Sequence, residues 1–120
     1  MKVKFVISDE FLDIAAKVRG LMDHFTQLGT VLASGRNTIR IFDLDQHRIN
    51  IKSFKRPNII NRFVYKYFRK SKAQRSFEYA TRLLEMGVGT PKPVAFCEHI
   101  DLSGLRASFY ASEHLDAQLT

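Results

Sequence analysis

Residues 48–91, RINIKSFKRPNIINRFVYKYFRKSKAQRSFEYATRLLEMGVGTP, decide the fold of this chain. In residues 48–54, apolar and polar side chains alternate with the period of two that is typical of a β-strand. Ile49 and Ile51 then lie on one face of the strand, and Lys52 lies on the other. The first part of the stretch therefore predicts a strand that carries a lysine.

The second part of the stretch predicts a helix. Ser71 and Gln74 have the spacing of a capping box, so the helix is expected to begin there. An apolar stripe follows at helical spacing, formed by Ala73, Phe77, Ala80, Leu83 and Leu84. Gly87 is the expected end, because glycine adopts the left-handed conformation of a helix C-terminus without strain. Glu78 lies early in this helix.

The flanking residues supply the rest of a sheet. Before the stretch, the sequence predicts an edge strand, a helix and two strands, at residues 2–8, 9–27, 30–33 and 38–43. Within and after it, the sequence predicts an amphipathic helix at residues 60–68 and two strands at 93–97 and 105–112. The expected fold class is α+β, with a five-stranded antiparallel sheet, the Glu78 helix packed on it and N-terminal helical material.

Composition indicates one domain with an anionic partner. The chain has 120 residues, a hydrophobic fraction of 45% and ten Phe, which suits a packed core. Its net charge of +7 fits nucleic acid, a phosphorylated substrate or an acidic membrane surface. Residues 1–29 are expected to form an extension, and residues 30–120 the main unit.

The sequence predicts neither a metal site nor a membrane span. Cys97 is a single cysteine, expected to be buried and inert, and the four His are scattered without metal-ligand spacing. No apolar stretch approaches the roughly 20 residues that span a bilayer, and the N-terminus does not resemble a signal peptide. We expect a cytoplasmic protein, or one peripheral to the inner membrane.

Lys52 and Glu78 have the order of a phosphate-binding pair. In phosphotransferases a strand lysine neutralises nucleotide phosphates, and a helix glutamate holds that lysine. Spacing also allows an exposed Lys52, with Glu78 paired to Arg82 or Arg75 along the helix. Lys55 is the rival lysine, but it falls on the opposite strand face.

A basic run is the strongest compositional signal. Residues 46–77 contain no Asp or Glu, and their cations are Arg48, Lys52, Lys55, Arg56, Arg62, Lys66, Arg69, Lys70, Lys72 and Arg75. Such a run suits nucleic acid or anionic lipid, and it is equally compatible with a solvated positive face. Gly35 lies alone in the turn at 34–37, so the turn is not a glycine-rich phosphate loop.

The motifs R-K-S-K-A-x-R-S at 69–76 and G-x-G-T-P-x-P at 87–93, together with the Lys52 strand, resemble the lipopolysaccharide kinase family of Kdo kinase and WaaP-like proteins. The resemblance covers roughly residues 31–120. It implies a protein-kinase-like N-terminal lobe, in which the Glu78 helix is the C-type helix. Lys52 would anchor ATP phosphates and Glu78 would pair with it. Ser34, Gly35, Arg36 and Asn37 would lie over the phosphates, and the backbone of Ser112, Glu113 and His114 would meet adenine.

The resemblance further implies phosphoryl transfer from ATP, with Mg²⁺, to a sugar hydroxyl of the lipopolysaccharide core or of Kdo-bearing lipid A. The basic run would then face an acidic glycolipid at the inner membrane, and nucleic acid is disfavoured. A catalytic aspartate loop and a metal-binding motif do not occur, and His114-Leu115-Asp116 is better interpreted as hinge. We therefore expect the metal ligands in a C-terminal lobe outside this sequence, and no transferase activity from this chain alone. A pseudokinase or scaffold lobe, and a basic binding module, stay open as alternatives.

Overall fold

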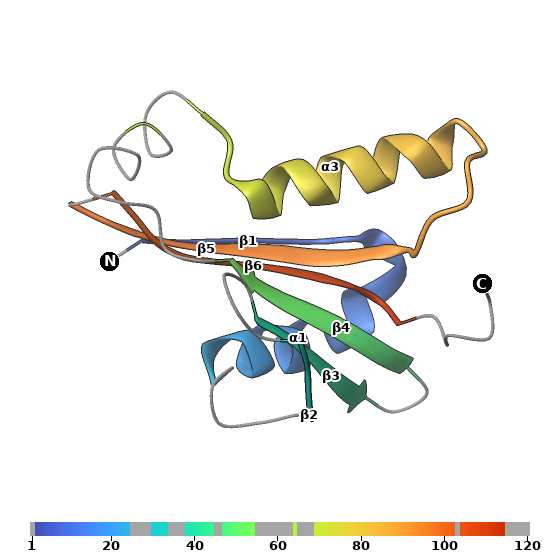
Figure 1. Cartoon of the computed structure of the whole chain (residues 1–120), viewed down its shortest axis with the longest axis horizontal. Helices are drawn as coiled ribbons and strands as arrows, with labels where there is room; N and C mark the ends of the chain where they lie inside the picture. Colours follow the sequence, from blue (N-terminus) through green and yellow to red (C-terminus); the bar gives the residue numbers. More distant parts are fainter. Residues whose placement is uncertain are drawn as a thin grey trace.

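The computed structural model describes residues 2–24, 30–33, 38–44, 47–54, 64, 69–102 and 104–114, with 30–33 described by backbone alone (Figure 1). Its elements in chain order are β1 (Lys2–Ile7), the 3₁₀ helix η1 (Asp9–Ile14), α1 (Ala15–Asp23), β2 (Thr30–Ala33), β3 (Thr38–Leu44), β4 (His47–Phe54), α3 (Lys72–Glu85), β5 (Pro93–Asp101) and β6 (Gly104–Glu113). The helix predicted at 60–68 lies outside the described residues, apart from Val64.

The strands form one open antiparallel sheet in the order β1-β5-β6-β4-β3-β2. The α+β class and the five predicted strands are confirmed. The sixth strand is β1, the predicted edge strand, which pairs with β5 from Lys2 opposite Ile100 to Ile7 opposite Ala95. The N-terminal segment is therefore hydrogen-bonded into the sheet that carries the rest of the fold.

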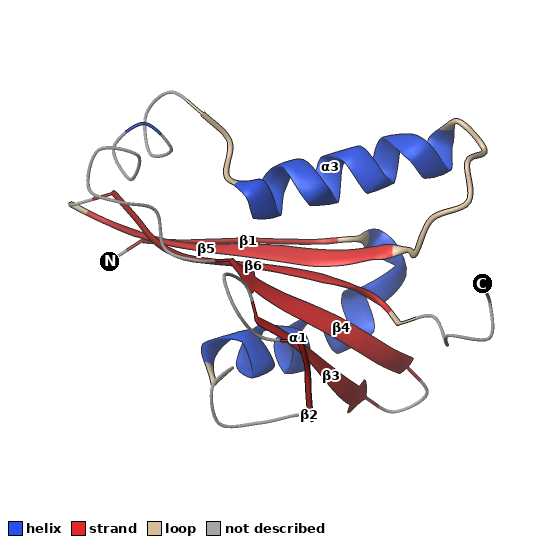
Figure 2. Ribbon diagram, viewed as in Figure 1, coloured by secondary structure: helices blue, strands red, loops and turns tan. Residues whose placement is uncertain are grey.

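Each face of the sheet is covered by different helices (Figure 2). The helices η1 and α1 lie on one face, and their buried residues are Phe11, Ile14, Val18 and Met22. These residues pack with Ile49 and Ile51 of β4, each 0% exposed. Complete burial of such an aliphatic side chain contributes about 1.5–3 kcal/mol to the free energy of folding. This burial stabilises the packing of the N-terminal helices on this face.

The N-terminal helical region differs from the prediction in one respect. We expected one helix over residues 9–27, but the region is divided into η1 and α1. Between η1 and α1 the backbone leaves helical geometry at Ile14, with φ −110° and ψ 12°, and it also does so inside η1 at Phe11, with φ −116° and ψ 19°. Phe11 and Ile14 are both buried, so both irregular positions carry side chains of the core.

The opposite face carries α3, and both ends of this helix follow the predicted chemistry. At the start, the Ser71 hydroxyl accepts a hydrogen bond of 3.0 Å from the backbone N–H of Gln74. At the end, Gly87 has φ 82°. The N–H of Val88 donates to the Leu83 carbonyl at 2.9 Å, and that of Gly87 to Leu84 at 3.0 Å, which is the Schellman pattern. The predicted limits of the helix are confirmed.

Loss of the N-cap should destabilise the fold. Ser71→Ala leaves a donor of the first turn without its side-chain partner, so we expect the free energy of unfolding to fall by about 1 kcal/mol. Urea unfolding followed by circular dichroism measures it. Ser76→Ala, in the middle of the same helix, is the control and should not destabilise, since alanine is the better helix former. Equal losses in the two variants would contradict the capping role.

Two glycines should respond to alanine in opposite directions. Gly87→Ala forces a side chain into positive φ and should cost about 1 kcal/mol of stability. Gly20→Ala should add roughly 0.5–1 kcal/mol, since Gly20 lies within α1 and an added Cβ meets nothing within 4 Å. The midpoints of thermal unfolding should therefore shift down for the first variant and up for the second. Shifts of the same sign would contradict these backbone roles.

Candidate functional site

Lys52 lies on the face of the sheet that α3 covers. Its strand neighbours are Ile39 on β3 and Tyr110 on β6, and Tyr110 lies opposite Phe96 of β5. The Phe96 ring contacts Phe77 of α3, with centroids 5.3 Å apart. The predicted orientation is therefore confirmed, with Ile49 and Ile51 buried on the opposite face.

The ammonium group of Lys52 lies over an aromatic ring. Its Nζ is 5.0 Å from the centroid of the Phe54 ring, which is within cation–π range. Phe54 is two residues farther along β4 and so projects from the same face. The lysine is thus held beside an aromatic ring at the end of the strand.

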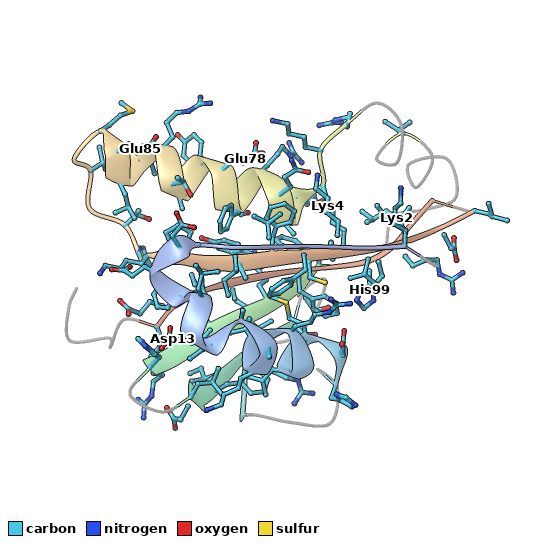
Figure 3. The ribbon with its side chains drawn as sticks, turned by 180° about the vertical axis from the view of Figure 1, so that it is seen from behind. Lys2, Lys4, Asp13, Glu78, Glu85 and His99 are labelled. Carbon is cyan, nitrogen blue, oxygen red and sulfur yellow. The ribbon has the colours of Figure 1, made fainter. Side chains whose placement is uncertain are left out.

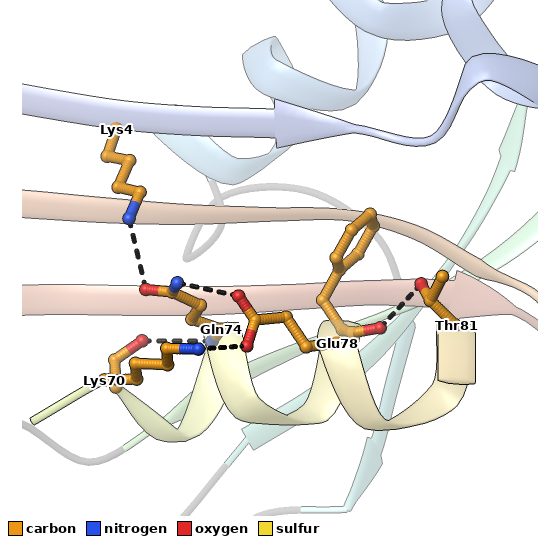
Figure 4. A network of polar contacts seen from close by, with 7 residues as sticks. Lys4, Lys70, Gln74, Glu78 and Thr81 are labelled. Atoms are coloured by element: carbon orange, nitrogen blue, oxygen red, sulfur yellow. Dashed lines mark hydrogen bonds and ion pairs between the residues drawn. The ribbon is translucent and has the colours of Figure 1, made fainter. Parts of the chain in front are cut away.

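Glu78 lies in a polar network on the other side of α3 (Figures 3 and 4). One carboxylate oxygen accepts a hydrogen bond from Lys70 Nζ at 2.8 Å, and the other accepts one from Gln74 Nε2 at 2.9 Å. The side-chain oxygen of Gln74 accepts in turn from Lys4 Nζ at 3.2 Å, and Lys4 belongs to β1. The flank of α3 that carries Glu78 therefore faces β1.

This orientation separates the two residues of the predicted pair. The sheet order puts β1 at one edge and β4 beyond β6, so α3 has one flank toward β1 and the other toward β4. Glu78 lies on the first flank, and Lys52 lies on β4. The structure does not bring Lys52 and Glu78 together. Glu78 forms a local ion pair instead, as the simpler interpretation allowed, but its partner is Lys70.

The Glu78 contacts lower the pKa of its carboxyl group. The hydrogen bond from Lys70 is the largest cause, and that from Gln74 is the second. Both donors stabilise the ionised carboxylate. The side chains of Lys70 and Glu78 are 60% and 42% exposed, so solvent screens their attraction.

The predicted hinge residues are bound within the fold. The backbone N–H of Glu113 donates to the Lys92 carbonyl at 2.9 Å, and that of His114 donates to Arg48 at 2.7 Å. The His114 ring nitrogen Nδ1 also lies 2.8 Å from the Asn50 side-chain oxygen. Both N–H groups are thus engaged, and contact of Ser112, Glu113 and His114 with adenine stays a prediction.

Other predicted features of the site have different outcomes. Ser34, Gly35, Arg36, Asn37 and the rival Lys55 lie outside the described residues. Cys97 is buried, and desolvation raises its pKa to about 11, which suits the inert thiol that we expected. Within the described residues, no group of three His, Cys, Asp or Glu is placed to hold a metal ion.

A groove lies between β4 and the flank of α3 that faces it. Its volume is about 460 Å³, and it is lined by Phe54, Lys72, Arg75, Ser76 and Tyr79. A second groove of about 270 Å³ shares Ser76 and Tyr79 and reaches the sheet at Tyr110 and the predicted hinge residue Ser112. This site was not among the features predicted from the sequence. The pattern that indicates it is the helical spacing of Lys72, Ser76, Tyr79 and Leu83 beside the apolar stripe.

Comparison with known proteins adds one likeness. No family model and no curated protein matches the chain. A solved structure, described as WaaP in complex with acyl carrier protein, matches 93% of this chain with a TM-score of 0.59 and 18% sequence identity. The chain has a kinase-like fold. It spans 41% of the length of that WaaP chain.

WaaP-like proteins belong to the family that the sequence resembles. At 18% identity, however, the structural likeness shows a shared fold and nothing further. That WaaP chain was solved with a protein bound to it.

Among the described residues of the present chain, no helix is long and apolar enough to cross a membrane.

The Glu78 network predicts a small pH dependence of stability. The pKa of Glu78 is lowered on folding, so its contribution is present above the unfolded value of 4.5 and is lost as pH falls through the folded value. Glu78→Gln should lower the free energy of unfolding by roughly 0.2–1 kcal/mol at neutral pH and low salt. Urea unfolding from pH 7 to pH 3 should show the difference from the parent shrinking with acid.

Glu85→Gln, on the same helix, is the control for this experiment. Glu85 is exposed and lies about two turns after Glu78, the residue that pairs with Lys70. Its substitution should therefore not reproduce the acid-dependent difference. A difference for Glu78→Gln that stays constant across the pH range would contradict the role of the ion pair.

Proposed function

We propose that this chain is the ATP-binding lobe of a kinase that phosphorylates a sugar of the lipopolysaccharide core, Kdo or heptose. The observation that supports it most is the likeness to WaaP over 93% of the chain. The strand order β2-β3-β4-β6-β5 agrees with it, with α3 on the same face as Lys52. The motifs at 69–76 and 87–93 resemble the same family independently of the fold.

Lys52 would serve the reaction by neutralising phosphate charge. Phosphoryl transfer depends on positioning and on compensation of the negative charge carried by the phosphates. Lys52 is suited to this because it has an ammonium group on a firmly packed strand, and its ring partner Phe54 is not a competing anion. The γ-phosphoryl group of ATP would pass to a sugar hydroxyl, whose proton goes to a base. We expect that base and the Mg²⁺ ligands outside the described residues.

Glu78 would join Lys52 only after a change in α3. The contacts that hold Glu78 toward β1 are side-chain contacts of partly exposed groups. Exposed ion pairs of this kind contribute about 0.2–1 kcal/mol, so a bound nucleotide could supply enough differential affinity to replace them. A turn of α3 that brought its Glu78 flank to β4 would also have to replace the packing of Phe77 on Phe96, and it would move Lys72 and Arg75 away from β4.

The acceptor would be an anionic glycolipid. Positive charge dominates the chain, with a net charge of +7, and Arg69, Lys72 and Arg75 lie exposed around the start of α3. Cations near an anionic surface gain about 1 kcal/mol each, so several of them favour a position at the inner membrane. The acceptor class therefore agrees with the sign of the charge and with the family resemblance.

Nucleotide binding through Lys52 tests the proposal. ATP with Mg²⁺ should raise the melting temperature of the chain, by an amount that corresponds to about 2.7 kcal/mol at 100 times the dissociation constant. Lys52→Met should lose most of this shift, because the phosphates lose their cation. Thermal unfolding at increasing ATP measures it.

Lys2→Met provides the matched control. Lys2 is exposed on β1, the edge strand that β5 and β6 separate from β4, so its substitution removes the same charge without touching the site. The Lys2 variant should keep the ATP shift. Equal ATP shifts in the parent and in Lys52→Met would contradict the role of Lys52 and favour a structural lobe. Strongly salt-dependent binding of RNA or DNA, with no response to ATP, would favour a nucleic-acid module.

A further inference from the structure

The flank of α3 that faces β4 carries two cations. In the predicted Lys52–Glu78 pair, the carboxylate of Glu78 would lie on this flank instead. Lys72 and Arg75 line the groove of about 460 Å³ together with Ser76, and Phe54 and Tyr79 complete it. The described residues of the lining include no Asp or Glu. The carboxylate of Glu78 is on the other flank, where Lys70 already compensates it.

Lys52 is a third cation at the edge of this groove. Its Nζ lies over the Phe54 ring, and that ring is part of the groove lining. Across the described part of the chain, none of Lys52, Lys72 and Arg75 has a carboxylate within the 4.0 Å of an ion pair. Lys72 and Arg75 therefore line the groove without a counter-ion from the described residues, and Lys52 reaches its edge through the Phe54 ring.

The positions of Lys72 and Arg75 are unfavourable for the helix itself. Both lie in the first turn of α3, which contains no acidic residue. The N-terminal end of a helix carries partial positive charge, so cations there reduce its stability. An external anion would offset this unfavourable interaction with the helix end.

The chemistry of the lining suits phosphate. The guanidinium group of Arg75 offers paired donors that match two phosphate oxygens, and lysines add point charges. The hydroxyl of Ser76 is a further donor beside them. The volume lies within the range of about 300–1,000 Å³ that is usual for small-molecule sites. A phosphate group or a short polyphosphate is therefore compatible with the groove.

We propose that the groove between β4 and the first turns of α3 binds phosphate groups, through Lys52, Lys72 and Arg75. The inference deepens the proposed function, since it shares Lys52 with it, but Lys72 and Arg75 belong to this groove alone. Two sources present this chemistry, the polyphosphate of a nucleotide and the phosphate of an anionic glycolipid.

Isothermal titration with inorganic tripolyphosphate at low ionic strength tests the groove. Arg75→Gln and Lys72→Gln should each weaken binding by about tenfold, which corresponds to the loss of one charge-assisted hydrogen bond. Arg82→Gln is the matched control. Arg82 lies seven positions after Arg75 on the same helix, is exposed and lines neither groove. Its substitution should change the affinity by less than about twofold, as a remote charge in salt solution does.

Stability provides a second readout. Since the first turn of α3 is a poor place for cations, Arg75→Gln and Lys72→Gln should unfold at the same temperature as the parent chain or higher when no ligand is present. Weaker tripolyphosphate binding with unimpaired stability supports the site. Equal weakening by Arg75→Gln and Arg82→Gln would mean that only the overall charge attracts anions, and it would overturn the proposal. So would a parent chain that does not bind tripolyphosphate.

Two further titrations identify the source. Metal-free ATP represents the nucleotide, and vesicles of phosphatidylcholine with phosphatidic acid represent a lipid phosphate. Weaker ATP binding by Arg75→Gln assigns the groove to the nucleotide, and weaker vesicle binding with ATP binding intact assigns it to a lipid phosphate. Either result supports the site. Unchanged binding of both ligands would overturn its biological assignment.

The two proposals fail in different ways. If the proposed groove site is wrong, Arg75→Gln and Lys72→Gln bind tripolyphosphate as the parent chain or the Arg82→Gln control does. Lys52→Met would still lose the rise in melting temperature with ATP and Mg²⁺. If the kinase proposal is wrong, Lys52→Met keeps that shift, while Arg75→Gln still weakens tripolyphosphate binding.

Discussion

The packing of α3 on β5 and β6 determines what the candidate site contains. The Phe77 ring lies against Phe96, and Ala73 and Ala80 are buried beside it. The two alanines let the helix approach the sheet closely, and the ring contact fixes its rotation. With the helix held in this way, each remaining side chain is directed to β1, to β4 or to solvent.

The rotation explains why the acid and the cations of α3 lie apart. Residues 74 and 78 are four apart and share the flank toward β1, where Lys4 reaches Gln74. Residues 72, 76 and 79 follow the same spacing on the flank toward β4. Moving Glu78 to β4 requires the helix to turn, which would break the buried packing of Phe77, Ala73 and Ala80 as well as the partly exposed polar contacts. A ligand drives this change only if its preference for the turned state exceeds the loss of both.

The sequence predicts those features of the fold that depend on neighbouring residues. Alternation along β4 places Lys52 on the face of the sheet opposite to that of Ile49. The Ser71 cap and Gly87 set the limits of α3, because both depend on local chemistry. The apolar stripe indicates that Glu78 lies off the buried face, but it does not reveal toward which strand. That direction depends on the position of β1 beside β5, a contact between residues distant in the chain. Neither the Glu78 network nor the basic groove could be predicted for this reason.

Lys52 connects the two flanks of α3. In the present arrangement it lies over Phe54, which lines the groove with Lys72 and Arg75, and it lies apart from Glu78. The packing of Phe77 and the Lys4–Gln74–Glu78 contacts favour this arrangement. A turn that brought Glu78 to Lys52 would replace a flank with cations by a flank with a carboxylate, whereas a phosphate bound in the groove would favour the flank with cations. The charge and number of bound phosphates would therefore influence which flank of α3 faces Lys52.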